Sequence, residues 1–165
     1  MDRMWAPWRG EYITNPLSVN PDKCIFCELS SVKPSKENLV VHIGKDGFVL
    51  MNKYPYNNGH IMVIPKKHVA SFDKLTDEEY KSLSNLMRLS IKVIYHVYNP
   101  QGCNVGMNIG RAAGAGLDSH IHYHVVPRWN GDTNFMPLLT EVKIISEHIL
   151  TTYEKLTKGF LEVLK

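Results

Sequence analysis

The stretch Asp118-Ser-His-Ile-His-Tyr-His-Val-Val-Pro-Arg128 places three histidines at a spacing of two residues. Successive side chains of a β-strand point to opposite faces of its sheet, so this spacing is typical of a strand. It predicts that His120, His122 and His124 project from one face, while the apolar residues between them pack against the other. The proline that follows, Pro127, is expected to close the strand.

A glycine-rich run, Gly110-Arg-Ala-Ala-Gly-Ala-Gly116, comes shortly before these histidines. Glycine allows backbone N–H groups to approach a phosphate, and histidine can act as a nucleophile or move protons near neutral pH. Attack on phosphorus by the middle histidine, His122, would give a covalent phosphoramidate, with imidazoles on both sides to contact substrate oxygens. The pattern therefore predicts a phosphate site with its own nucleophile.

A second set of candidate ligands is the stretch Cys24-Ile-Phe-Cys27. Two thiolates at this spacing can share one tetrahedral metal ion, but they can also form a redox pair or have no joint role. Histidines at alternate positions of a strand can ligate a metal as well, so a purely metal-binding role is a rival interpretation of the three histidines. The two roles are compatible if one histidine binds the ion and another binds the substrate.

Composition and charge narrow the class of protein. The chain has 165 residues, a formal net charge of +3 and 44% hydrophobic residues, which is ordinary for a single globular domain. Its basic residues are scattered, which argues against nucleic-acid binding but suits a polyanionic small molecule. It has no apolar run long enough to span a bilayer, no apolar signal segment, and an odd number of cysteines, namely three. These features predict a cytoplasmic protein without a membrane partner.

Hydrophobic patterning in the rest of the chain predicts two helices and several strands. A capping box of Thr76 and Glu79 is expected near the start of a helix over residues 75–98, and a second amphipathic helix is expected over about 146–164. The strands predicted besides the histidine strand cover residues 39–43, 47–52, 60–65 and 104–110. Strands with two segregated helices indicate an α+β fold with a mostly antiparallel sheet.

The first 22 residues have no clear hydrophobic period and contain Trp5, Trp8 and Tyr12. Large aromatic side chains in a short terminal segment usually anchor it to the body of a protein or to a partner subunit. We therefore predict an aromatic arm over residues 1–22 and a single domain over residues 23–165.

The histidine stretch resembles the histidine triad family, whose motif is His-φ-His-φ-His-φ-φ with φ an apolar residue. Residues 120–126 match this motif in full, and the similarity extends to residues 48–65, which contain a Gly-His turn, and to residues 104–128. The opening Trp5-Ala-Pro-Trp-Arg9 and the ending Val125-Val-Pro-Arg-Trp129 look like one subgroup of the family. That subgroup is related to diadenosine tetraphosphate phosphorylases and to fragile histidine triad hydrolases.

The resemblance implies a five-stranded antiparallel sheet with two main helices, paired into a homodimer with one continuous sheet. It also implies nucleotidyl transfer or hydrolysis at the α-phosphate of an adenine nucleotide or dinucleoside polyphosphate, through a covalent AMP–histidine intermediate. His122 would carry the adenylyl group, His124 would contact the phosphate and position the leaving group, and His120 would complete the catalytic set. The other implied nucleotide contacts are Asn52 at the ribose and Asn108, Ala113, Gly114, Ala115 and Gly116 at the phosphate.

The resemblance also implies cofactors. In zinc-bearing relatives two cysteines and two histidines hold a structural zinc ion. The matching residues here are Cys24, Cys27, His68 and His120. Magnesium is a further cofactor expected to accompany the substrate.

One position departs from the hydrolase branch of the family. That branch has a glutamine whose amide contacts phosphate, and this chain has Gly116 there. The smaller residue leaves room for a second acceptor such as inorganic phosphate, which slightly favours a phosphorylase over a hydrolase. The alternatives are an adenosine phosphoramidase, or a module that binds AMP or adenine nucleotides and has only incidental catalysis.

Overall fold

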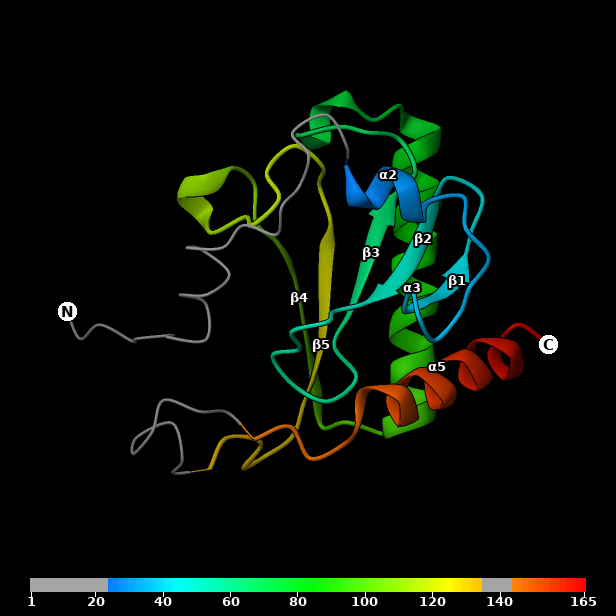
Figure 1. The fold of residues 1–165 in the computed structure, drawn as a ribbon, viewed down its shortest axis with the longest axis vertical. Coiled ribbons are helices and arrows are strands. Elements are labelled where there is room, and N and C mark those ends of the chain that lie inside the picture. The colour runs from blue at the N-terminus through cyan, green and yellow to red at the C-terminus, as the bar shows by residue number, and fades with distance from the viewer. Residues whose placement is uncertain (1–23, 135–143) are drawn as a thin grey trace.

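The computed structural model describes residues 24–134 and 144–165, in which five antiparallel strands form one sheet with two long helices on one face (Figure 1). The strands are β1 (Val40–Ile43), β2 (Gly47–Met51), β3 (Ile61–Pro65), β4 (Gly102–Met107) and β5 (Tyr123–Arg128), in the spatial order β1-β2-β3-β5-β4. The helices are α2 (Ile25–Leu29), α3 (Asp77–Tyr98) and α5 (Ile149–Val163), with 3-10 turns at Phe72–Lys74 and Arg111–Ala113. The predicted α+β class is confirmed, and the predicted arm over 1–22 lies outside the described residues.

The larger hydrophobic core lies between the sheet and the helices α3 and α5. Its strand residues include Val41, Val49, Met51, Ile61, Val63 and Val125, and the helices supply Leu83, Leu86, Val93, Ile94, Tyr153, Leu156 and Phe160. Full burial of one such side chain stabilises the fold by roughly 1.5–3 kcal/mol. Because Val125 points into this core, its neighbours His124 and Val126 point to the opposite face of the sheet.

A smaller core on that opposite face joins α2 to the sheet. Phe26 of α2 is buried together with Val40, Phe48, Leu50, Met62 and Ile64. The Phe26 ring also meets the rings of His120 and His122 edge-on, with centroids 5.5 and 5.1 Å apart. This packing brings the two cysteines of the CxxC stretch, which flank Phe26, next to His120.

The histidine stretch departs from the prediction, because the regular strand begins only at Tyr123. The N–H of Ile121 donates to the carbonyl of Val69 at 2.8 Å instead of to a neighbouring strand, and the pairing of β3 with β5 stops at Tyr123. His120 and His122 therefore precede β5, and only the third histidine lies within it. The strand also runs one residue past Pro127, to Arg128.

Helix α3 begins with the predicted capping box. The N–H of Glu79 donates to Oγ1 of Thr76 at 3.2 Å, and the N–H of Thr76 donates to the Glu79 carboxylate at 2.8 Å. The helix starts at Asp77, two residues later than predicted, because Leu75 is extended after a 3-10 turn. Helix α5 likewise begins at Ile149 rather than near residue 146.

Helices α3 and α5 approach each other closely, and Val93 of α3 is fully buried. A Cβ atom added to Gly159 of α5 would lie only 2.4 Å from Cγ2 of Val97 and 3.1 Å from Cγ1 of Val93. Glycine at position 159 thus lets the two helices pack closer than any side chain there would allow.

No helix in the described part of the chain combines the length and the apolar character needed to cross a bilayer.

We expect Gly159→Ala to lower the free energy of unfolding by about 1–3 kcal/mol, although alanine favours a helix over glycine by about 1 kcal/mol. The added methyl group collides with Val97. Urea unfolding followed by circular dichroism measures the change. In the double variant with Val97→Ala the combined loss should be smaller than the sum of the single losses, because the colliding methyl groups are gone. Additive losses would contradict this account of the helix contact.

Candidate active site and metal site

His122 is held by a hydrogen bond to the backbone two residues earlier. Its Nδ1 lies 3.0 Å from the carbonyl oxygen of His120. A carbonyl oxygen can only accept, so this bond places the imidazole proton on Nδ1 and leaves Nε2 with its lone pair. Burial lowers the pKa of His122, which favours the neutral imidazole. His122 therefore offers an unprotonated ring nitrogen, as a nucleophile requires.

His124 carries its ring proton on the other nitrogen, and a hydrogen bond from a fourth histidine, His60, fixes this position. The N–H of Tyr56 donates to Nδ1 of His60 at 3.0 Å, so neutral His60 carries its proton on Nε2. His60 Nε2 then donates to Nδ1 of His124 at 2.9 Å, and His124 carries its own proton on Nε2. The ring centroids of His122 and His124 are 5.0 Å apart. The site thus pairs a ring nitrogen lone pair with a ring N–H donor.

His60 is the site residue that the sequence reasoning missed. It is 1% exposed, and burial lowers its pKa to about 3, with nearby His124 and His122 adding to the shift. It therefore stays neutral and remains a donor to His124. The signal that could have indicated it is its place directly after Gly59 in the Gly-His turn, where it was predicted only as the start of a strand.

A second group of side chains meets beside His120. The ligand atoms of Cys24, Cys27, His68 and His120 all lie within 4.8 Å of one another. Nδ1 of His120 is 3.3 Å from Sγ of Cys24 and 3.6 Å from Sγ of Cys27, and Nδ1 of His68 is 3.2 Å from Sγ of Cys27. Metal bonds of about 2.0–2.3 Å at tetrahedral angles place ligand atoms about 3.5 Å apart. The four residues predicted as metal ligands are therefore brought together at a suitable spacing.

The hydrogen bonding of His120 also suits a metal ligand. Its Nε2 donates to the carbonyl of Pro65 at 2.9 Å, which leaves the lone pair on Nδ1, the nitrogen that faces the cysteines. Burial raises the pKa of Cys27 to about 11, and its contact with Cys24 adds to the shift. A divalent cation would relieve the repulsion between two such thiolates. This group can therefore hold a metal ion, whereas the predicted magnesium ion has no comparable ligand group among the described residues.

An open cavity of about 520 Å³ lies beside His124, on the face of the sheet away from α3 and α5. Three of the residues predicted to contact a nucleotide line it, namely Asn108, Ala113 and His124. Its walls also include Tyr56, Asn57, Asn104, Gly106 and Arg128, none of which the sequence reasoning singled out. The cavity is large enough for part of a nucleotide. Its walls carry neutral polar side chains and one guanidinium group, that of Arg128.

The glycine-rich loop is folded more tightly than the prediction assumed. The N–H groups of Ala113, Gly114 and Ala115 donate to carbonyls within the loop at 2.9 to 3.3 Å, so they do not point to a ligand in this conformation. The side-chain amide of Asn108 donates to the carbonyl of Gly114 at 3.4 Å, and Gly116 is exposed at the end of the loop. The loop therefore lies beside the cavity but presents it with a side-chain amide rather than a row of backbone donors.

Asn52 lies at the end of β2, next to the buried histidine pair. Its amide nitrogen is 3.4 Å from Nδ1 of His60, and its amide oxygen accepts the N–H of Tyr54 at 2.9 Å. It is not among the residues that line the cavity beside His124. Its predicted contact with a ribose stays a prediction.

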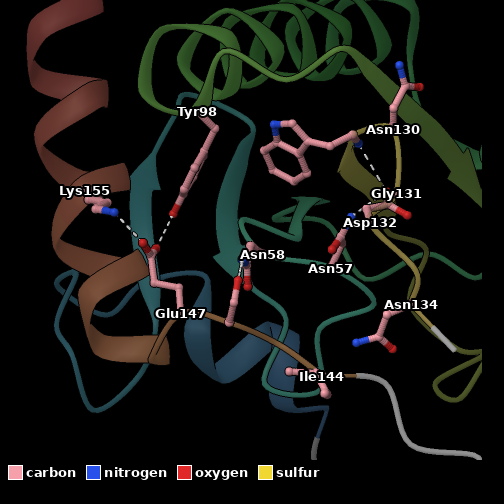
Figure 2. Close-up of a pocket in the computed structure, with 12 residues that line it drawn as sticks. Asn57, Asn58, Tyr98, Asn130, Gly131, Asp132, Asn134, Ile144, Glu147 and Lys155 are labelled. Atoms are coloured by element: carbon pink, nitrogen blue, oxygen red, sulfur yellow. Dashed lines mark hydrogen bonds and ion pairs between the residues drawn. The ribbon is translucent and has the colours of Figure 1, made fainter. Parts of the chain in front are cut away.

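A second cavity, of about 510 Å³, lies just beyond the end of β5 at Arg128, and the residues lining it include none of the described histidines (Figure 2). Glu147 forms one wall, where it accepts the Tyr98 hydroxyl at 2.8 Å and pairs with Lys155. The Trp129 ring stands edge-on to Tyr98, with centroids 6.2 Å apart. These contacts join the end of α3 to the start of α5.

The sequence and the structure were compared with known proteins. A family model described as the HIT domain matches residues 33–131. The chain belongs to the HIT family. An AP-4-A phosphorylase from Mycobacterium tuberculosis is 38% identical over 158 residues, which cover 92% of this chain and 80% of that protein. The resemblance drawn from the sequence is thereby confirmed.

Two further HIT relatives widen the comparison. An adenosine 5′-monophosphoramidase from Schizosaccharomyces pombe is 32% identical over 107 residues, which cover 65% of this chain and 75% of that protein. A solved structure of a zinc-bound histidine triad family protein from Mycobacterium smegmatis superposes with a TM-score of 0.68 at 22% identity, covering 85% of this chain and 94% of that one. As a member of the HIT family, this protein is a nucleotide hydrolase or transferase.

We expect the free energy of unfolding to fall as the pH is lowered from about 6.5 to about 3, partly because of His60. Its pKa is about 3 in the folded protein and about 6.5 in the unfolded chain, so in this range the unfolded chain binds a proton that the folded protein does not. Above pH ~6.5 the titration of His60 costs no stability. Below that pH, the free energy of unfolding falls by at most ~1.4 kcal/mol per pH unit because of His60.

Urea unfolding of the wild type and of His60→Gln between pH 4 and 7 measures this effect. The variant should show a shallower loss of stability with falling pH, because it lacks the group that titrates. The same change at His96 is the control and should alter the slope far less, because the ion pair of His96 with Glu162 is exposed and screened by solvent. Equal slopes for the wild type and His60→Gln would show that His60 is not held neutral by burial.

Proposed function

We propose that this HIT protein cleaves diadenosine polyphosphates at the α-phosphate, through a covalent AMP group carried by His122. The observation that carries the proposal is the hydrogen bond from His122 Nδ1 to the His120 carbonyl, because it leaves Nε2 unprotonated. The 38% identity to an AP-4-A phosphorylase over most of the chain supports the choice of substrate class.

The transfer proceeds in two steps. Nε2 of His122 attacks the α-phosphorus and forms a P–N bond, while the P–O bond to the leaving nucleotide breaks and its electron pair stays on the leaving oxygen. The Nε2–H of His124, held in place by His60, donates to that oxygen. An acceptor then attacks the phosphorus and releases His122. Most of the rate gain comes from this positioning and from stabilising the developing charge.

The acceptor decides the product. Water would release AMP, and inorganic phosphate would release ADP. We favour phosphate, because the small residue Gly116 stands where the hydrolase branch has a glutamine and because the phosphorylase relative covers most of the chain. Cleavage of AMP from an amine is the second candidate activity, which the identity to a monophosphoramidase supports.

We also propose that Cys24, Cys27, His68 and His120 bind zinc. A set of two cysteines and two histidines is typical of structural zinc sites, and a HIT protein with the same fold is described as zinc-bound. The ion would cross-link α2, the segment after β3 and the start of the histidine stretch. In this way it would hold the backbone carbonyl that orients His122.

The remaining parts of the proposal concern nucleotide contacts, assembly and location. Asn52 would contact the ribose, and Asn108 with residues 113–116 would contact the phosphate once the hydrogen bonds within the loop from Ala113, Gly114 and Ala115 open. A homodimer with a continuous sheet requires pairing at an edge strand, and β1 and β4 are the edges of the described sheet. A cytoplasmic location suits three cysteines that are free in the structure.

Incubation of the protein with diadenosine tetraphosphate and inorganic phosphate should yield ADP and ATP, separated by ion-exchange chromatography. AMP and ATP would indicate hydrolysis instead. His122→Ala should lower kcat by about 10³-fold or more, because it removes the nucleophile. His148→Ala, which changes the histidine that caps α5, is the control and should stay active. AMP binding without turnover of any adenylylated substrate by the wild type would replace the enzyme proposal by the nucleotide-binding module.

Metal analysis should find about one zinc ion per chain. The double variant Cys24→Ser, Cys27→Ser should lose it, whereas Cys103→Ser, at the third cysteine, should retain it. A chelator should also lower the Tm of the wild type, because metal binding stabilises only the folded state. An unchanged zinc content in the double variant would refute the ligand set.

A further inference from the structure

The cavity beside His124 continues along one face of β4 and β5. Alternate residues of a strand share a face, so His124, Val126 and Arg128 of β5 lie beside Asn104 and Gly106 of β4. All five of these residues line the cavity of about 520 Å³. The cavity therefore contains a groove that runs along the two strands from His124 toward Arg128, and on the other side of His124 it continues to Asn108 and Ala113.

The strand register places the far end of this groove close to His124. Gly106 pairs with His124, and Asn104 pairs with Val126. These two pairs are two residues apart, which is about 6.6 Å along a strand. Arg128 turns back toward His124, because its Nη1 donates to Oδ1 of Asn104 at 2.9 Å. The guanidinium group is thus near the Asn104–Val126 pair, two residues along the strands from Gly106 and His124.

Arg128 is held in place before any ligand binds. Its Nε and Nη2 donate to the Asp132 carboxylate at 2.6 and 3.0 Å. That carboxylate also accepts the amide of Asn57 at 2.9 Å and the N–H of Trp129 at 3.2 Å. With Asn104 included, these contacts use three of the five N–H donors of the guanidinium. The Arg128 side chain is 46% exposed, so the group remains accessible to an anion.

The floor of the groove between these groups is open. A Cβ atom added to Gly106 would have no atom within 4 Å, although Gly106 lies directly opposite His124 in the sheet. Asn104 is exposed on the same face. A chain of phosphates can therefore pass from His124 over Gly106 to Asn104 and Arg128 without displacing a side chain.

We propose that this groove binds the leaving group of the transfer, and that Arg128 and Asn104 bind those phosphates of a polyphosphate that lie beyond the one at His124. Guanidinium groups suit this role because their planar N–H groups match phosphate oxygens. The proposal rests on the proposed function and specifies its substrate class. A nucleoside triphosphate leaving group reaches Arg128, whereas an amine or a phenol ends at His124. The groove thereby selects substrates with long polyphosphate chains.

The test compares two substrates with the same adenylyl half. Diadenosine tetraphosphate releases a nucleoside triphosphate, and the p-nitrophenyl ester of AMP releases a phenol. Asn104→Asp places a carboxylate next to Arg128 and repels phosphate, so the ratio of kcat/KM for the tetraphosphate to kcat/KM for the ester should fall about tenfold. Asn130→Asp makes the same charge change at the second cavity and should keep the wild-type ratio.

A second variant acts by volume rather than charge. Gly106→Val fills the floor of the groove between His124 and Arg128 and should lower the same ratio. Its Tm should stay near that of the wild type, because a Cβ atom at this position has no atom within 4 Å.

Three outcomes would overturn the proposal. Wild-type kcat/KM values for both substrates in Asn104→Asp would show that the distal phosphates do not reach Arg128. An equal fall in kcat/KM for both substrates would place the effect of the variant on the adenylyl half and would leave the proposed function intact. No turnover of either substrate by the wild type would remove the proposed function and this inference with it.

Discussion

The hydrogen bond from His120 Nε2 to the carbonyl of Pro65 is the contact on which both parts of the site depend. It directs the Nδ1 lone pair of His120 toward Cys24 and Cys27. It also holds the backbone at residue 120, whose carbonyl accepts the proton of His122. His120 thus connects the metal-ligand group to the candidate nucleophile, with its ring nitrogen facing the cysteines and its backbone carbonyl bound to His122. The same contact lies where the regular pairing of β3 and β5 has ended, so an interruption of the strand is what allows the site to form.

The two remaining histidines differ in chemistry because they differ in their hydrogen-bond partners. His122 faces a carbonyl, which forces its proton onto Nδ1, whereas His124 accepts from His60 and keeps its proton on Nε2. The buried position of His60, with a pKa of about 3, makes this arrangement insensitive to pH in the physiological range. Neighbouring residues of one type therefore supply both an electron pair and a donated proton, which phosphoryl transfer uses at the attacking atom and at the leaving oxygen.

The two faces of the sheet have different roles: one packs against the helices in the core, and the other carries the candidate site. The face that carries Val125 is covered by α3 and α5, whose close contact at Gly159 leaves no room for a ligand. The other face is covered only in part, by α2 over the first three strands in spatial order. Over β4 and β5 it stays open, and the groove from His124 to Arg128 lies there. The rigid sheet thus sets the distance between the candidate reaction centre and the residues that would read the leaving group.

Local patterns in the sequence were sufficient for the α+β class, the helices and the capping box at Thr76, and the histidine motif indicated the HIT family. The set of Cys24, Cys27, His68 and His120 was implied by the resemblance to that family, and the structure brings these four residues together. Each of these predictions depends on residue spacing or on a motif, which a single chain displays directly. Spacing misled at the histidines themselves, because a period of two cannot tell a strand from an extended segment whose backbone bonds elsewhere, as Ile121 does to Val69.

Only the tertiary structure decided the proton positions and the neighbours of the histidines. His60 meets His124 across 64 residues of chain, His120 meets Pro65 across 55, and Cys24 meets His120 across 96. Such partners leave no local period in the sequence. The role of Arg128 likewise depends on the register of β4 against β5, which places Asn104 within its reach. The sequence by itself therefore indicated the three histidines and the cysteine–histidine set, whereas the packing of distant segments decided which other residues join them and which atom of each is available.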